Sequence, residues 1–360
     1  MLRTFGWSVA VTAVVFGVAL YVGGTEVLLV VAILSVLEIS LSFDNAVINA
    51  TVLKRMSELW QKLFLTIGVL IAVFGMRLVF PIIIVAVTAG LSPAAVWDMA
   101  VHSPADYEAA LQAAHPSIAA FGGMFLALVF LDFIFEQREI SWLIWIERPL
   151  AKLGAVQAMS TLVALCGLVV AAMVLADPAD EVSVLVSGVI GVISYLAVNG
   201  LAVVFESTAD PADDELAGVS GAARAASGGV ATGKAALFLF LYLEVLDASF
   251  SFDGVIGAFA ITSNIFIIAA GLGVGAMYIR SLTVYLVRRG TLDDYVFLEH
   301  GAHYAIGALA VILLLNLKYE IPELVTGLIG VGLIGLAFGA SLRRNWKQAH
   351  LIPPELVETG

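Results

Sequence analysis

Two acidic motifs in this chain share one pattern of acid, serine and aromatic residues. The first, EISLSFD, runs from Glu38 to Asp44, and the second, DASFSFD, runs from Asp247 to Asp253. Each motif lies inside a long apolar run, where a charged side chain costs on the order of 2.5–3.5 kcal/mol at the centre of a membrane helix. Because the chain carries this cost twice in the same register, we predict that these acids serve a function and not structure alone.

The residues in and around the two motifs offer oxygen ligands for a cation. Carboxylate and amide oxygens suit Mn²⁺, Mg²⁺ or Ca²⁺, and the neighbouring sequence has no cysteine, methionine pair or histidine cluster that would favour a softer metal. Closely spaced carboxylates inside a membrane also suit a transport cycle coupled to protons. The candidate metal ligands are Glu38, Asp44, Asn45, Glu244, Asp247 and Asp253.

The spacing of the acids predicts irregular helices. A straight helix points the first and last acids of one motif about 120° apart, so they cannot hold one ion unless the helix unwinds. Serine side chains can bend a helix by bonding to its backbone carbonyls. Ser42 and Ser251 are therefore predicted to support the site and to help break both helices.

The composition indicates a polytopic membrane protein. Hydrophobic residues make up 61% of the 360 residues, against about 45–50% in a soluble domain. The net charge of −12 gives no sign of nucleic-acid binding. The single cysteine, Cys166, excludes a disulfide framework and a thiolate metal site. The lipid bilayer is thus the first expected partner.

Runs of about 17–25 apolar residues mark candidate membrane helices. Such runs recur along the whole chain, whereas a barrel would show short alternating segments. We therefore predict an all-α fold with ten membrane spans, at 5–23, 27–53, 63–89, 117–135, 154–176, 182–205, 235–261, 264–287, 301–317 and 322–342.

The positions of lysine and arginine predict the orientation of these spans. Basic residues gather in segments 54–62, 136–153 and 206–234, whereas 90–116 has none. With ten spans the basic loops share one side of the plasma membrane. This predicts that both termini are cytoplasmic and that 90–116 lies outside. Segment 136–153 is amphipathic and is expected at the cytoplasmic interface.

The predicted orientation makes the two motifs an inverted repeat. The first motif lies on a helix that runs from outside to inside, and the second on a helix that runs from inside to outside. Secondary transporters are commonly built in this way, with the substrate site near the middle of the membrane. We predict a first five-helix repeat at 1–176 and a second at 177–360.

Two arginines, Arg77 and Arg280, lie deep in predicted spans, where each needs a partner or a water-filled cavity. Each is either a structural ion-pair partner or a part of the transport cycle. Their depths in the membrane predict pairs across the repeats, Arg77 with Asp253 and Arg280 with Asp44.

With these motifs the chain resembles the TerC family of integral membrane proteins. The matching residues are LE at 37–38, SFDNA at 42–46 and FSFD at 250–253. Gly254 stands where many relatives have serine. The family is similar to the LysE-type exporters. The resemblance implies export of divalent cations, above all Mn²⁺, with the acids of both motifs as the binding site.

The resemblance covers about 26–342 and looks like a divergent branch of the family whose function is unknown. The long segment 90–116 and the sequence EHGAH at 299–303 are typical of this branch. His300 and His303 lie on one face of a helix. Two interpretations of this pair stay open, a packing or interface role and a proton or metal role.

Two functions stay open. The leading hypothesis is a secondary exporter of a divalent cation, with Mn²⁺ favoured over Ca²⁺ or Mg²⁺, driven by proton exchange. The alternative is a non-transporting membrane scaffold in an assembly that responds to metalloid or envelope stress. The sequence has no Walker motif for an ATP-driven pump, and we expect neither enzyme activity nor a tightly bound cofactor.

Overall fold

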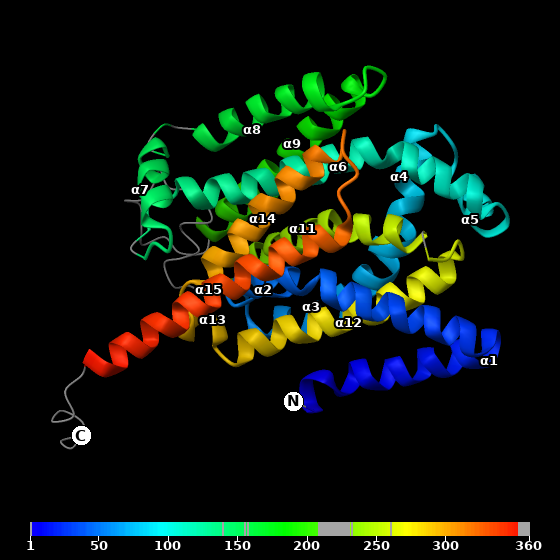
Figure 1. Ribbon diagram of the computed structural model, residues 1–360, viewed down its shortest axis with the longest axis horizontal. Coiled ribbons are helices and arrows are strands. Elements are labelled where there is room, and N and C mark those ends of the chain that lie inside the picture. The colour runs from blue at the N-terminus through cyan, green and yellow to red at the C-terminus, as the bar shows by residue number, and fades with distance from the viewer. Residues whose placement is uncertain are drawn as a thin grey trace.

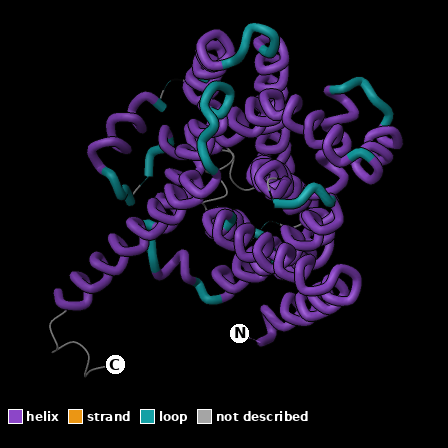
Figure 2. The backbone as a smooth tube through the Cα atoms, turned by 45° about the vertical axis from the view of Figure 1, so that its right-hand side comes forward, coloured by secondary structure: helices purple, strands orange, loops and turns teal. Residues whose placement is uncertain are grey.

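The computed structural model describes residues 2–138, 140–154, 156, 158–207, 231, 233–259 and 261–351. These residues form helices joined by short loops, and no strand forms among them (Figure 1, Figure 2). The elements are α1 (Leu2–Leu41), α2 (Phe43–Leu53), α3 (Glu58–Leu70), the π-helix η1 (Ile71–Val79), α4 (Phe80–Thr88), α5 (Pro93–His102), α6 (Pro104–Phe135), α7 (Ile144–Leu153), α8 (Met159–Val170), the π-helix η2 (Ala171–Leu175), α9 (Glu181–Ser207), α11 (Gly233–Phe259), α12 (Ile265–Arg288), α13 (Thr291–Asp294), α14 (Leu298–Leu315) and α15 (Glu323–Leu351).

Seven helical stretches in the described part of the chain are long and apolar enough to cross a membrane. They are Phe5–Leu41, Glu58–Thr88, Pro104–Phe135, Glu181–Gly200, Ile265–Arg288, Leu298–Leu315 and Leu324–Gln348. The predicted fold class is confirmed, because the chain is an all-α polytopic membrane protein. The total of ten spans and the inverted repeat stay predictions.

The other predicted spans also fall on helices. α1 contains the span predicted at 5–23 and, after the chain reverses at Gly24, the first part of the span at 27–53, which α2 completes (Figure 1). Gly24 has a φ of 66°, which glycine adopts without steric cost. α11 coincides with the span predicted at 235–261 as far as Phe259. The apolar helix at Met159–Leu175 is shorter than the span predicted at 154–176.

Two segments predicted as connections contain helices of their own. α5 and the first turns of α6 lie within 90–116, and α7 lies within the amphipathic segment 136–153. α6 begins at Pro104, since proline fits the first helical position, where its missing N–H is not needed. The loop predicted at 206–234 lies almost wholly outside the described residues.

Two apolar clusters fill the interior, and the acidic motifs lie between them. One cluster includes Val47 and Leu246, and the other includes Leu34 and Val255. Along the chain, the first motif falls between Leu34 and Val47, and the second falls between Leu246 and Val255. Both motifs therefore lie at the level where the two apolar clusters meet.

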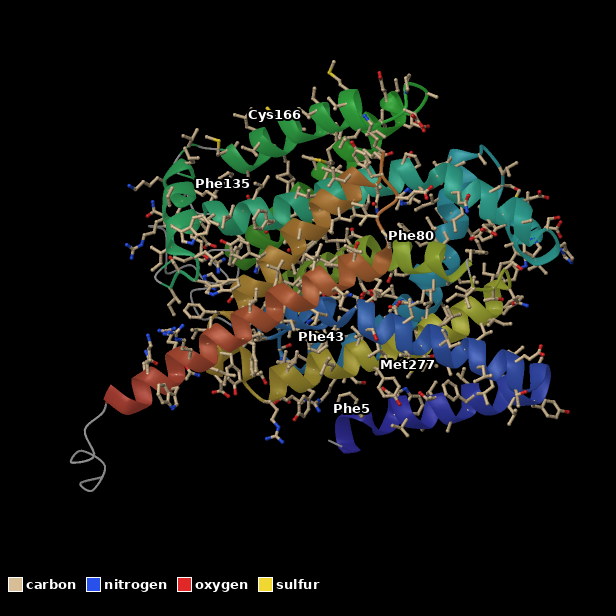
Figure 3. The ribbon with its side chains drawn as sticks, viewed as in Figure 1. Phe5, Phe43, Phe80, Phe135, Cys166 and Met277 are labelled. Carbon is tan, nitrogen blue, oxygen red and sulfur yellow. The ribbon has the colours of Figure 1, made fainter. Side chains whose placement is uncertain are left out.

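The helices that carry the motifs pack against each other. α2 and α11 are in contact, and both also contact α12. α1 packs along α12, and α14 packs between α6 and α15. Phe43, the first residue of α2, lies near the centre of the bundle (Figure 3). The packing thus brings motifs that are far apart in sequence to one place.

Candidate transport site

The first acid site consists of Glu38, Ser42 and Asp44 with Arg77. Glu38 lies near the end of α1 and is only 3% exposed. The Arg77 Nη2 donates to Glu38 Oε1 in a buried ion pair, and Ser42 Oγ donates to the same oxygen at 3.1 Å. A buried carboxylate needs such donors, because an unpaired charge in a low-dielectric interior is strongly destabilising.

An irregular helix positions Arg77. The residue lies in η1, a π-helix of nine residues that interrupts the stretch from α3 to α4. Its Nη1 donates to the carbonyl of Ala72 in the same π-helix at 2.5 Å. Long π-helices are rare, and short π segments occur frequently at functional sites. The buried arginine therefore lies in the irregular part of this helix.

The second acid site consists of Glu244 and Asp247 with Arg280. Arg280 on α12 donates to both carboxylate oxygens of Glu244, at 3.0 and 3.1 Å, and to Asp247 Oδ2 at 2.9 Å. Its guanidinium lies 4.3 Å from the ring centroid of Phe64, where a cation–π contact adds to its stabilisation. This site is buried, and its two acids share one guanidinium.

The two sites use equivalent residues. Glu38 and Asp247 are the first acids of their motifs, and each is bound by an arginine from a later helix of its own half of the chain, Arg77 for Glu38 and Arg280 for Asp247. Among the described side chains, each arginine thus pairs with acids of its own half of the chain. This correspondence agrees with the internal repeat that the sequence predicts.

Of the two predicted cross-repeat pairs, Arg280 with Asp44 needs correction, and Arg77 with Asp253 stays a prediction. Arg280 pairs with Glu244 and Asp247 and not with Asp44. Arg77 pairs with Glu38, and the predicted partner Asp253 has a side chain outside the described residues. Depth in the membrane was the only basis of the prediction. It ignores the rotation of each helix, which here turns the arginines toward acids of the same half.

The motif helices differ in their regularity. α1 ends at Leu41 and α2 begins at Phe43, with Ser42 between them at φ −98° and ψ 16°. The predicted break is thus confirmed in the first motif, as a kink that keeps the backbone bond from Ser42 N to Glu38 O. In the second motif the prediction is wrong, because α11 continues through Ser251 without interruption.

One hydrogen bond joins the two motifs directly. Asn45 Nδ2, from the first motif, donates to Asp247 Oδ1 of the second at 2.7 Å. In the opposite direction, a Cβ placed on Gly254 would lie 3.3 Å from Glu38 Oε2. Each motif therefore ends beside the first acid of the other.

A cavity of about 430 Å³ reaches the first acid site. Its buried end includes Glu38 and Asp44, and its rim includes the exposed residues Gln112 and Glu320. A Cβ on Gly330 of α15 would lie 2.6 Å from Asp44 Oδ2, so only glycine lets α15 approach this acid. The other lining residues are Leu41, Ser42, His115, Phe250, Gly254, Ile256, Leu309, Asn316, Ile321, Thr326 and Gly327.

The charge of this lining favours cations. Among the described residues, the lining has three acids, Glu38, Asp44 and Glu320, and no lysine or arginine. A cleft lined by one sign of charge concentrates ions of the opposite sign. Gln112, His115 and Glu320 were not among the residues predicted for the site. In the sequence they are marked only as polar residues next to an apolar run.

The predicted ligand set is divided between the two acid sites. Glu38 and Asp44 border the cavity, whereas Glu244 and Asp247 surround Arg280. In the part of the chain that the structure describes, no three or more His, Cys, Asp or Glu side chains come close enough to hold a metal ion. Ser251 is buried on α11. The metal-binding roles of all these residues stay predictions.

The histidine pair lies outside the acid sites. His300 Nε2 lies 3.0 Å from the backbone oxygen of Ile140. The ring of His303 stacks on Phe133, with 3.8 Å between the ring centroids. These contacts join α14 to the end of α6 and the segment before α7, and they favour the packing interpretation.

Comparison with known proteins gives a family but no characterised relative. Neither the search of curated proteins nor the search of solved structures finds a match. The resemblance to the TerC family is thus still a prediction. Residues 43–348 match the family described as a protein of unknown function, DUF475. Since this match covers most of its length, the chain belongs to the DUF475 family and is a membrane-helical member of it.

Proposed function

We propose that the chain is a secondary transporter that exports a divalent cation, with Mn²⁺ as the leading candidate, in exchange for protons. The observation that carries the proposal is the acid-lined cavity that runs from Gln112 and Glu320 at the surface to the buried acids Glu38 and Asp44. Hard divalent cations bind carboxylate, amide and hydroxyl oxygens together with water. Besides its acids, the cavity offers the amides of Gln112 and Asn316 and the hydroxyls of Ser42 and Thr326.

Arg77 and a cation compete for Glu38 in this proposal. Without a cation, Arg77 neutralises the buried carboxylate. A divalent cation that reaches Glu38 and Asp44 brings the positive charge that Arg77 otherwise supplies, and the π-helix around Arg77 can shift its side chain away. On the return step one proton on each of the two carboxylates replaces the two positive charges of the cation, so that both carboxylates are neutralised in each step.

The second acid site serves the other half of the cycle. In inverted-repeat transporters, one half of the molecule rocks against the other around a site near the midplane. We expect Arg280 to release Asp247 and Glu244 when the pathway opens on the opposite side. Asn45 and Asp253, as predicted ligands, would then complete an oxygen site there.

The proposed orientation places both termini in the cytoplasm and the mouth of the cavity outside. A cysteine at Ala105, in α6, should be labelled by an impermeant thiol reagent in intact cells, and a cysteine at Ala222 should not. Ala222 lies outside the described residues. The assay requires a Cys166→Ser background, because Cys166 is exposed. The reverse labelling pattern would place the cavity mouth in the cytoplasm.

A non-transporting scaffold is the second candidate. It is favoured by one observation, since the first acids of both motifs are neutralised by buried arginines, as in structural ion pairs. A scaffold would need the ion pairs for folding and would have no use for an acid-lined cavity. We propose transport, and not catalysis, as the activity of this chain.

Cellular Mn²⁺ content separates the two candidates. Cells that express the protein should hold less manganese, and tolerate more of it, than cells that express Glu38→Gln or Asp44→Asn. Asp98→Asn is the matched control, because Asp98 is an exposed acid that pairs with His102 on α5, away from the cavity. Equal manganese content in all four strains, at equal protein levels, would favour the scaffold.

A further inference from the structure

Asn45 and Gly254 occupy equivalent positions in the two motifs. Asn45 directly follows Asp44 at the end of the first motif, and Gly254 directly follows Asp253 at the end of the second. Each position lies beside the first acid of the other motif, Asn45 beside Asp247 and Gly254 beside Glu38. The two positions therefore offer different groups to equivalent acids.

Asn45 supplies a donor where Gly254 supplies none. The side-chain amide of Asn45 donates to Asp247 Oδ1, while Arg280 donates to Asp247 Oδ2, so both oxygens of this acid accept hydrogen bonds. In the first site, Arg77 and Ser42 both donate to Glu38 Oε1, whereas Oε2 faces Gly254. Within the described residues no donor to Oε2 is found, and a carboxylate oxygen left free in this way is the one that a cation can take.

The cavity reaches the acid beside the glycine. Glu38 and Gly254 both line it, and among the described lining residues neither Asn45 nor Asp247 takes part. A side chain at position 254 would extend into the space between the cavity and Glu38 Oε2. The missing side chain thus keeps the path to this oxygen clear.

We propose that Gly254 determines which acid site the cation occupies. With glycine at 254, a cation that enters the cavity binds the first acid site at Glu38, while Asn45 keeps the second acid site closed to it. In this conformation the protein binds one cation and not one at each motif. The inference rests on the proposed cation transport for the identity of the ligand, and on geometry alone for the access to Glu38.

Two substitutions test this role. Gly254→Asn copies the donor of Asn45 beside Glu38, and Gly254→Ala adds only a methyl group, which requires a few tenths of an ångström of movement at the carboxylate. Both variants are purified in detergent and checked for the wild-type elution volume and melting temperature. Mn²⁺ binding is measured by the loss of the free-ion signal in electron paramagnetic resonance. Modification of Glu38 by a carbodiimide is measured by mass spectrometry.

We expect one Mn²⁺ per wild-type chain and similar binding to Gly254→Ala. Binding to Gly254→Asn should be about tenfold weaker, because the cation must displace a hydrogen bond from the asparagine amide to the charged carboxylate. Carbodiimide should modify Glu38 in the wild type and in Gly254→Ala at similar rates, and several-fold more slowly in Gly254→Asn. Equal modification of Glu38 in all three proteins would overturn the role of Gly254.

The two readouts separate this inference from the proposed function. If none of the three proteins binds Mn²⁺ and Glu38 is protected from carbodiimide in Gly254→Asn alone, the proposed cation is wrong and the role of Gly254 in access stands. If the wild type binds Mn²⁺ and Gly254→Asn binds it equally well, the proposed function stands and the role of Gly254 is wrong. Binding of two ions per wild-type chain would also contradict the inference.

Discussion

The two acid sites share a sequence pattern and differ in their backbone and their access to solvent. The first lies at a kink between α1 and α2, is bound by an arginine from a π-helix and borders a cavity. The second lies on the uninterrupted α11, is bound by an arginine from the regular helix α12 and contains two acids around one guanidinium. Equivalent residues thus serve an irregular, accessible site and a regular, closed one.

This difference shows where the membrane interior tolerates irregular helices. Backbone groups freed by a kink or a π-helix must find partners, and they do so most readily where they line a polar cavity. Both irregularities, at Ser42 and around Arg77, occur at the first acid site. Glu244, Asp247 and Arg280 of the second site do not line the cavity at the first site. Its serine Ser249 donates back to the carbonyl of Val245 at 2.9 Å, which leaves the helix intact.

Removal of the two arginines should have unequal effects on stability, and this is the largest difference that we expect. Arg280→Gln leaves Glu244 and Asp247 buried without a cation, which should lower the free energy of unfolding by about 3–5 kcal/mol. Arg77→Gln should cost less, because water in the cavity can reach Glu38. Thermal unfolding of the purified variants measures both. A greater loss in Arg77→Gln would contradict the contrast between the closed and the accessible site.

Removal of the bond between the motifs should have an intermediate effect. Asn45→Ala removes the donor to Asp247 Oδ1, and a hydrogen bond to a charged group contributes about 1.5–3 kcal/mol. Asn345→Ala is the control, because Asn345 makes its bond to the backbone of Asp294 at an exposed site. Its loss should change the melting temperature far less. Equal shifts in the two variants would show that the second site does not depend on Asn45.

Removal of single serines should have the smallest effect and should again differ between the sites. Ser42→Ala removes a donor to Glu38 Oε1 and should cost about 1 kcal/mol. Ser249→Ala removes only a bond to a carbonyl that the helix already uses, and it should be close to neutral. The same unfolding assay compares them. A larger loss in Ser249→Ala would remove the distinction between a serine that binds the acid and one that binds the backbone.

The sequence predicted the helices well, because apolar runs of membrane length are a strong signal. The runs at 264–287 and 301–317 correspond closely to α12 and α14. It also predicted one repeated motif as the candidate site, and Asn45 joins the two copies through Asp247. Composition and repeated motifs thus predicted the corresponding features of the fold.

Features that depend on the rotation of helices could not be predicted. The partners of Arg77 and Arg280 follow from the direction in which each side chain leaves its helix. The π-helix at Ile71–Val79, which ends just before Pro81, changes that direction for Arg77. The same limit applies to the cavity. Gln112 lines this cavity together with Glu320 only because α6 begins at Pro104, well before the span predicted at 117–135.

The most direct test of the account is Mn²⁺ flux in liposomes that contain the purified protein and enclose a manganese-sensitive dye. The wild type and Asp98→Asn should carry Mn²⁺ down its gradient, faster with an opposing proton gradient. Glu38→Gln should reduce the initial rate at least about tenfold, because it removes the negative charge for which the cation and Arg77 compete. A Glu38→Gln protein that folds normally and transports at the wild-type rate would contradict the claim that the first acid site carries the cation.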